Sequence, residues 1–142
     1  MSDLHKEIEF ETEICEYLAN HGWHYASDDA QTYDRARALF PADLIAWIQT
    51  TQARDWETLT QTHGSSAETI LCDRLRQSID QRGTLDVLRH GIELLGLRQS
   101  LRLAQFKPAI ALNPDILKDY AANRLRVVRQ VRYSCLLYTS DA

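Results

Sequence analysis

A single run of alternating residues near the C-terminus constrains the fold of this chain more than any other feature. From Leu125 to Tyr133 the side chains alternate with a period of two, and valine recurs, which is typical of a β-strand. No other run is a convincing strand, and one strand cannot satisfy its own backbone donors and acceptors. The pattern therefore predicts that this strand needs partners, and that the chain stops in the middle of a sheet.

The rest of the chain has apolar residues at helical spacing. Pro41 and Pro114 suit the first position of a helix, Asn113 suits an N-cap, and Gly22 suits a C-terminal stop. Ser65 and Glu68 have the spacing of a capping box. Helices are expected at about 5–21, after Phe40, and at about 55–62, 65–81, 84–95 and 114–123. The expected fold class is mostly α with a C-terminal β-strand.

Composition is that of a soluble globular domain, with 44% hydrophobic and 25% charged residues. No apolar run approaches the ~20 residues that span a bilayer, so no membrane partner is expected. The acidic, polar N-terminus does not resemble an export signal, which predicts a cytoplasmic protein. The three cysteines, Cys15, Cys72 and Cys135, match no metal-binding spacing and are expected to be reduced thiols. No nucleotide-binding loop or hydrolase motif is present.

Charge is unevenly distributed along the chain. Residues 1–97 carry 8 Lys/Arg and 17 Asp/Glu, a net charge of −9, whereas residues 98–142 carry 8 and 3, a net charge of +5. A basic segment on an acidic chain fits a surface that binds phosphates. It fits equally well an internal match between acidic helices and a basic strand, and the sequence leaves both interpretations open.

Four blocks of sequence together resemble a known family. They comprise residues 10–18 with Gly22 and Trp23, residues 33–35 leading into 38–41, residues 83–91, and finally residues 106–109, 112–114 and 120–134. In this order, over about Glu7 to Ser134, they resemble the N-terminal region of the DNA-cleaving R subunit of bacterial type I restriction-modification enzymes. The last block is the longest and most specific of the four.

The resemblance implies a truncated α/β restriction-endonuclease-like nuclease domain of the PD-(D/E)xK type in residues 1–134. In that family an Asp and a Glu-x-Lys bind Mg²⁺, because paired carboxylates hold a hard cation that polarises the phosphate and activates water. The full-length subunit also carries an ATP-driven motor, so Mg²⁺ and ATP are its implied cofactors. It cleaves foreign unmethylated DNA, and DNA and the methylation and specificity subunits are the implied partners.

The chain departs from this family at its C-terminal end. The family's Asp and Glu-x-Lys lie beyond Ser134, where this chain reads Cys-Leu-Leu-Tyr-Thr-Ser-Asp-Ala instead. Residues 135–142 look like a translated adapter or vector junction and are expected to be a tail outside the domain. We therefore expect no complete metal site, no Mg²⁺ or ATP bound by this chain, and no nuclease activity from it alone.

The resemblance leaves few candidate site residues. Glu11 matches a position where some nucleases of this type place an accessory acidic residue, but it is also one of five glutamates between Glu7 and Glu16, where a solvated carboxylate is ordinary. The block Tyr33-Asp34-Arg35 fits a structural corner. Four arginines are candidates for DNA phosphate contacts or for pairing with the acidic helices: Arg124, Arg126, Arg129 and Arg132. The alternative function is a stand-alone helical interaction module or small regulator.

Overall fold

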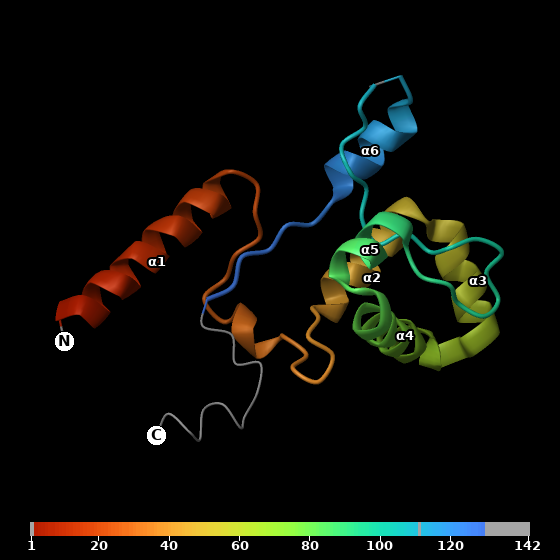
Figure 1. Cartoon of the computed structure of the whole chain (residues 1–142), viewed down its shortest axis with the longest axis horizontal. Helices are drawn as coiled ribbons and strands as arrows, with labels where there is room; N and C mark the ends of the chain where they lie inside the picture. Colours follow the sequence, from red (N-terminus) through yellow and green to blue (C-terminus); the bar gives the residue numbers. More distant parts are fainter. Residues whose placement is uncertain (1, 111, 130–142) are drawn as a thin grey trace. The chain divides into compact units, whose positions relative to one another are not determined.

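The computed structural model describes residues 2–110 and 112–129 of the chain (Figure 1). The chain divides into two compact units. The first unit combines the two ends of the sequence, Met1–Ala36 and Arg124–Ala142, and the second is the continuous stretch Arg37–Asn123. Each unit is described by itself below.

The first unit begins with helix α1, Ser2–Asn20, which ends as the sequence predicts. Gly22 has a φ of +93°. The N–H of Trp23 donates to the carbonyl of Leu18 at 3.0 Å, and this hydrogen bond closes a turn of six residues. This is the glycine C-cap geometry, in which a left-handed residue lets the chain satisfy an otherwise orphaned carbonyl. A short 3-10 helix, η1 (Asp29–Gln31), follows in the next loop.

The expected C-terminal strand and the restriction-endonuclease-like α/β fold are wrong for the described chain. The described residues are mostly helical and contain no sheet. Within 125–129 there is only an isolated parallel bridge, between His24 and Arg126, in which the N–H of His24 donates to Leu125 and the N–H of Val127 donates back to His24. Residues 130–133 of the expected strand lie outside the described residues.

The physical reason for this error is that alternation is necessary for a strand but does not supply a partner. Only His24 pairs with the described part of this segment, through hydrogen bonds of 2.7 and 3.0 Å. Arg126 and Arg129, which fall on opposite phases of the alternation, each meet a carboxylate of the same unit. The described part of this segment is therefore held by two ion pairs and one backbone bridge, not by a β-ladder.

The second unit is built from helices around one core. Its α-helices are α2 (Pro41–Thr51), α3 (Ala53–His63), α4 (Ala67–Arg82), α5 (Thr84–His90) and α6 (Pro114–Ala122), with the 3-10 helix η2 (Gly64–Ser66) before α4. Helix α4 contacts α2, α3 and α5, and α2 also contacts α6 (Figure 1). None of the described helices has the length and apolar character needed to cross a membrane.

Local signals place most of these helix ends. Pro41 and Pro114 stand at helix starts, and the Asn113 side chain accepts a hydrogen bond from the N–H of Asp115 at 2.9 Å, as an N-cap should. The capping box expected at Ser65 is wrong. Residues 64–66 form the 3-10 helix instead, and Ser66, which precedes α4, makes no side-chain cap hydrogen bond.

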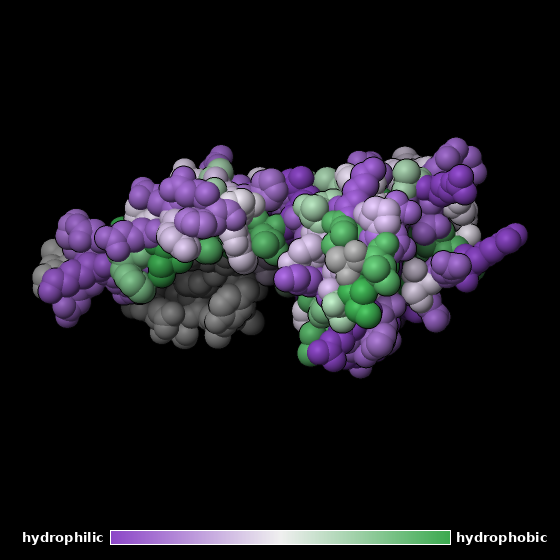
Figure 2. All heavy atoms as spheres, turned by 90° about the horizontal axis from the view of Figure 1, so that it is seen from above, coloured by the Kyte–Doolittle hydropathy of each residue, from purple (hydrophilic) through white to green (hydrophobic). Residues whose placement is uncertain are grey.

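The core of the second unit consists of buried apolar side chains from α2, α3, α4, α5 and the segments after α5. Fully burying one such side chain stabilises the fold by about 1.5–3 kcal/mol relative to leaving it exposed. Large apolar side chains also stay exposed, among them Phe10 and Tyr17 on α1 and Leu95 in the second unit, and Figure 2 shows apolar residues at the surface. The core cluster comprises Trp47, Ile48, Leu59, Ala67, Leu71, Leu75, Val87, Ile92, Leu94 and Leu101.

Candidate functional site

The structure brings Glu11 and Arg129 together within the first unit. Glu11 lies on α1 and is partly buried, and its Oε2 accepts hydrogen bonds from Arg129 Nη2 at 3.1 Å and from Nε at 3.3 Å. Arg129 also donates from Nη1 to the Thr12 hydroxyl at 3.0 Å and from Nη2 to the Ile8 carbonyl at 3.3 Å. Hydrogen bonds with Tyr25, chiefly, and with Glu11 raise the pKa of Arg129. The contacts with Glu11, Thr12 and Ile8 therefore hold this guanidinium against α1.

A second pair joins Arg126 to Asp29. Arg126 Nη1 donates to Asp29 Oδ2 at 2.6 Å, and the same oxygen accepts the N–H of Ala26 at 2.9 Å. The Asp29 side chain is only 12% exposed. Because a short charge-assisted hydrogen bond is stronger than a neutral one, this contact orders the loop before η1 as well as the arginine. Nothing in the sequence singles out Asp29, since its partner lies 97 residues away.

The remaining predicted site residues are less constrained. Arg124 is exposed at the start of the C-terminal segment, and Arg132 lies outside the described residues. Tyr33 and Asp34 are partly buried, Arg35 is exposed, and a turn follows over residues 35–38, so the role of this block as a structural corner stays a prediction. Contact of the arginines with DNA phosphates stays a prediction, and so does the accessory role of Glu11.

Metal-ligating groups do not gather in the described part of the chain. No cluster of three or more His, Cys, Asp or Glu side chains there has a geometry that could hold an ion. The expectation of reduced, buried thiols is confirmed for Cys15 and Cys72, whereas Cys135 lies outside the described residues. Glu11 and Asp29 each already accept a guanidinium.

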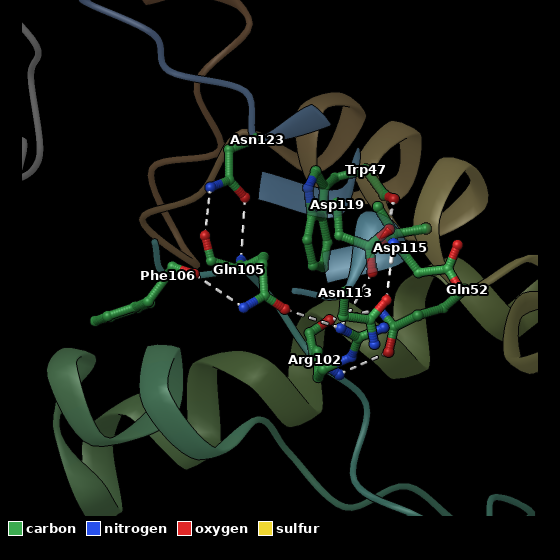
Figure 3. Close-up of polar contacts among 10 residues, drawn as sticks. Trp47, Gln52, Arg102, Gln105, Phe106, Asn113, Asp115, Asp119 and Asn123 are labelled. Carbon is green, nitrogen blue, oxygen red and sulfur yellow. Dashed lines mark hydrogen bonds and ion pairs between the residues drawn. The ribbon is translucent and has the colours of Figure 1, made fainter. Parts of the chain in front are cut away.

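The second unit contains a polar network that sequence reasoning missed. The Gln52 side-chain amide donates to the carbonyl of Arg102 at 2.8 Å and accepts its N–H at 2.9 Å. The Asn123 side-chain amide likewise donates to the carbonyl of Gln105 at 2.7 Å and accepts its N–H at 3.1 Å (Figure 3). Each amide imitates one rung of a β-ladder, which satisfies both backbone groups of an irregular segment.

An ion pair links the same segment to α6. Arg102 Nη1 lies 3.2 Å from Asp119 Oδ2 and 3.2 Å from Gln105 Oε1 (Figure 3). Nearby, the Trp47 indole nitrogen is buried without a hydrogen-bond partner in the described structure. The glutamine, the asparagine and the ion pair together hold residues 102–105 between the ends of α2 and α6, so we assign this network a structural role.

No protein-family model, no curated protein and no solved structure matches this chain. Any inference about function therefore rests on the four sequence blocks and on the contacts described above. Of the residues that the resemblance singles out, the structure brings together Glu11 and Arg129, from the first and the last block.

Proposed function

We propose that this chain belongs to the R subunit of a type I restriction-modification enzyme, the subunit that cleaves foreign unmethylated DNA with ATP as fuel. In this proposal the chain contributes a supporting part of the subunit, without a complete catalytic centre. DNA and the methylation and specificity subunits are its proposed partners in the cytoplasm. Mg²⁺ and ATP act in the full-length subunit, where the Asp and Glu-x-Lys would hold the metal.

The contact between Glu11 and Arg129 is the observation that supports this proposal best. These residues are 118 positions apart, and they belong to the first and the last of the four resemblance blocks. The backbone bridge between His24 and Arg126 joins the same two parts of the sequence. The first and the last of the four resemblance blocks therefore contact each other within one unit, as parts of one domain would.

In the proposed subunit Arg129 positions Glu11. Two nitrogens of its guanidinium face one carboxylate oxygen, and two further donors are engaged by Thr12 and Ile8 of the same helix. A carboxylate held in this way has a fixed direction, which an accessory acidic group beside a metal requires. The α/β fold first expected is not part of this proposal.

The decisive experiment is to sequence the source DNA downstream of codon 134. The proposal predicts a reading frame that continues into an Asp, a Glu-x-Lys and an ATP-driven motor, beside genes for methylation and specificity subunits. A stop codon directly after this point in the intact genome, with no such neighbours, would refute it.

A charge exchange tests the positioning of Glu11 on the protein itself. We expect Glu11→Arg to lower the urea midpoint of unfolding, because it sets two guanidinium groups against each other, and we expect Arg129→Glu in the same chain to restore it. Arg35→Gln, an exposed arginine of the same unit, is the matched control and should leave the midpoint unchanged. A double variant no more stable than Glu11→Arg alone would show that the pair does not position Glu11.

The second candidate function, a helical interaction module, is favoured by one observation. The second unit, Arg37–Asn123, has a buried core of its own. The same sequencing experiment separates the two functions, because a module of this kind needs no downstream nuclease residues.

A further inference from the structure

A large hollow opens on the second unit between α4 and the loop of residues 93–100. Its volume is about 910 Å³, and it is lined by Ile70 and Arg74 of α4 and by most of the loop. Pockets for small ligands commonly measure roughly 300–1,000 Å³. The hollow lies wholly within one unit, and none of its lining residues belongs to the four resemblance blocks.

The loop that forms one wall is held closed at its base. The N–H of Ile92 donates to Leu101 at 3.0 Å, the N–H of Leu101 donates to Ile92 at 2.7 Å, and both side chains are fully buried. Inside the loop, the N–H of Leu97 donates to the carbonyl of Leu94 at 3.2 Å. Compact loops with adjacent ends are frequently functional, and a wall fixed before binding lowers the entropic cost of binding.

Two arginines provide positive charge in the hollow. Arg74 is fixed by hydrogen bonds from Nε to the Glu93 carbonyl and from Nη1 to Gln77, both at 3.2 Å. Among the residues that the structure describes, the Arg98 guanidinium has no hydrogen-bond or ion-pair partner. Glu93 is the single acidic residue of the lining, so the lining has a net charge of +1.

The other half of the lining is apolar. Of the apolar lining residues, Leu94 is buried, Leu97 and Ile70 are partly buried, and Leu95 is 82% exposed. An exposed leucine beside a pocket leaves apolar surface in contact with water, and a bound ligand would cover that surface. Among the described residues, the lining therefore combines apolar side chains with a guanidinium that has no hydrogen-bond or ion-pair partner.

We propose that this hollow binds a small amphipathic carboxylate, a molecule with one carboxylate group and an apolar body. The carboxylate pairs with Arg98, whose planar guanidinium matches two carboxylate oxygens, and the body lies against Leu94 and Leu97. The net charge of +1 fits a monoanion, whereas Glu93 disfavours the second charge of a phosphate monoester. This binding is independent of the restriction function proposed above.

The test is calorimetric titration of the full chain with three probes: octanoate, octanol and acetate. Octanoate should bind, octanol should bind more weakly, and acetate should not bind measurably, because each of the last two lacks half of the recognised chemistry. Arg98→Gln should weaken octanoate binding about tenfold or more, as expected for losing a hydrogen bond to a charged group. Glu93→Gln should strengthen it.

Arg89→Gln is the matched control, since Arg89 is an exposed arginine of α5 outside the hollow. It should leave octanoate affinity unchanged, and helical circular dichroism should show that all three variants are folded. Equal affinity for octanol and octanoate, equal losses in Arg98→Gln and Arg89→Gln, or weaker binding in Glu93→Gln would each overturn the proposal.

Discussion

Gly91 ends α5 in a backbone conformation that should make it one of the least replaceable residues of the second unit. Its φ and ψ are +72° and −169°, a region essentially open only to glycine. A Cβ built on Gly91 would also lie under 3.0 Å from the backbone carbonyl of Leu101. Gly83 has nearly the same conformation, +85° and 156°, but nothing lies within 4 Å of its hypothetical Cβ. Comparing an alanine substitution at Gly83 with one at Gly91 therefore distinguishes the cost of backbone strain from the cost of the steric clash with Leu101.

The expected magnitudes follow from this comparison. Gly83→Ala should cost roughly 1–3 kcal/mol of unfolding free energy, the usual range for a residue in a disfavoured backbone region. Gly91→Ala should cost the same strain and should also separate Ile92 from Leu101. Their two hydrogen bonds contribute about 0.5–1.5 kcal/mol each, so Gly91→Ala should be more destabilising by roughly 1–3 kcal/mol. Against a total stability of about 5–15 kcal/mol, that difference is large.

Urea unfolding followed by tryptophan fluorescence measures both variants. Trp47 and Trp56 report on the second unit, and Trp23→Phe in the parent chain removes the signal of the first. Equal destabilisation by Gly91→Ala and Gly83→Ala would refute the reasoning, because it would show that the approach of Leu101 to Gly91 adds nothing beyond backbone strain.

Two further predictions concern the polar network and the absence of catalysis. Asn123→Ala should lower the free energy of unfolding by about 1–3 kcal/mol, because it leaves the N–H and the carbonyl of Gln105 without their 3.1 and 2.7 Å partners, and Asn123→Asp should cost at least as much, because it sets a carboxylate oxygen against the Gln105 carbonyl in place of the donor; the same urea assay decides, and an Asn123→Asp variant as stable as the parent chain would contradict the bidentate contact. Purified chain incubated with supercoiled plasmid, Mg²⁺ and ATP should leave the plasmid intact, because Glu11 alone cannot hold Mg²⁺ in the required geometry; nicking that disappears in Glu11→Ala would overturn this expectation.

Local sequence signals predicted most helix ends of this chain, because their causes lie within a few residues. Proline at a first helical position, Asn113 as an N-cap and Gly22 as a C-cap each act on backbone groups no more than five residues away. The capping box failed for a related reason. The Ser65–Glu68 spacing permits that geometry, but the 3-10 helix at residues 64–66 already uses these backbone positions.

Long-range contacts could not be predicted from the sequence in the same way. Arg126 meets Asp29 across 97 positions, and any of the 20 acidic residues could have been its partner. The amide contacts of Gln52 and Asn123 are equally silent in the sequence, because they recognise backbone groups that every residue has. The same limit explains the wrong strand, since pairing depends on a neighbour that periodicity does not name.

The contacts of Arg126 and Arg129 bear on how a basic segment could meet DNA. Affinity for phosphates comes largely from releasing counterions that the cationic groups and the polyanion hold when apart. An arginine already paired with a carboxylate holds fewer counterions, so it releases fewer of them when it binds a phosphate. The phosphate must also displace that carboxylate. Asp29 is 2.6 Å from Arg126 and mostly shielded from water, so this exchange is least favourable there. In the proposed restriction subunit, a DNA phosphate that contacts Arg126 or Arg129 would therefore have to displace a carboxylate of the same unit.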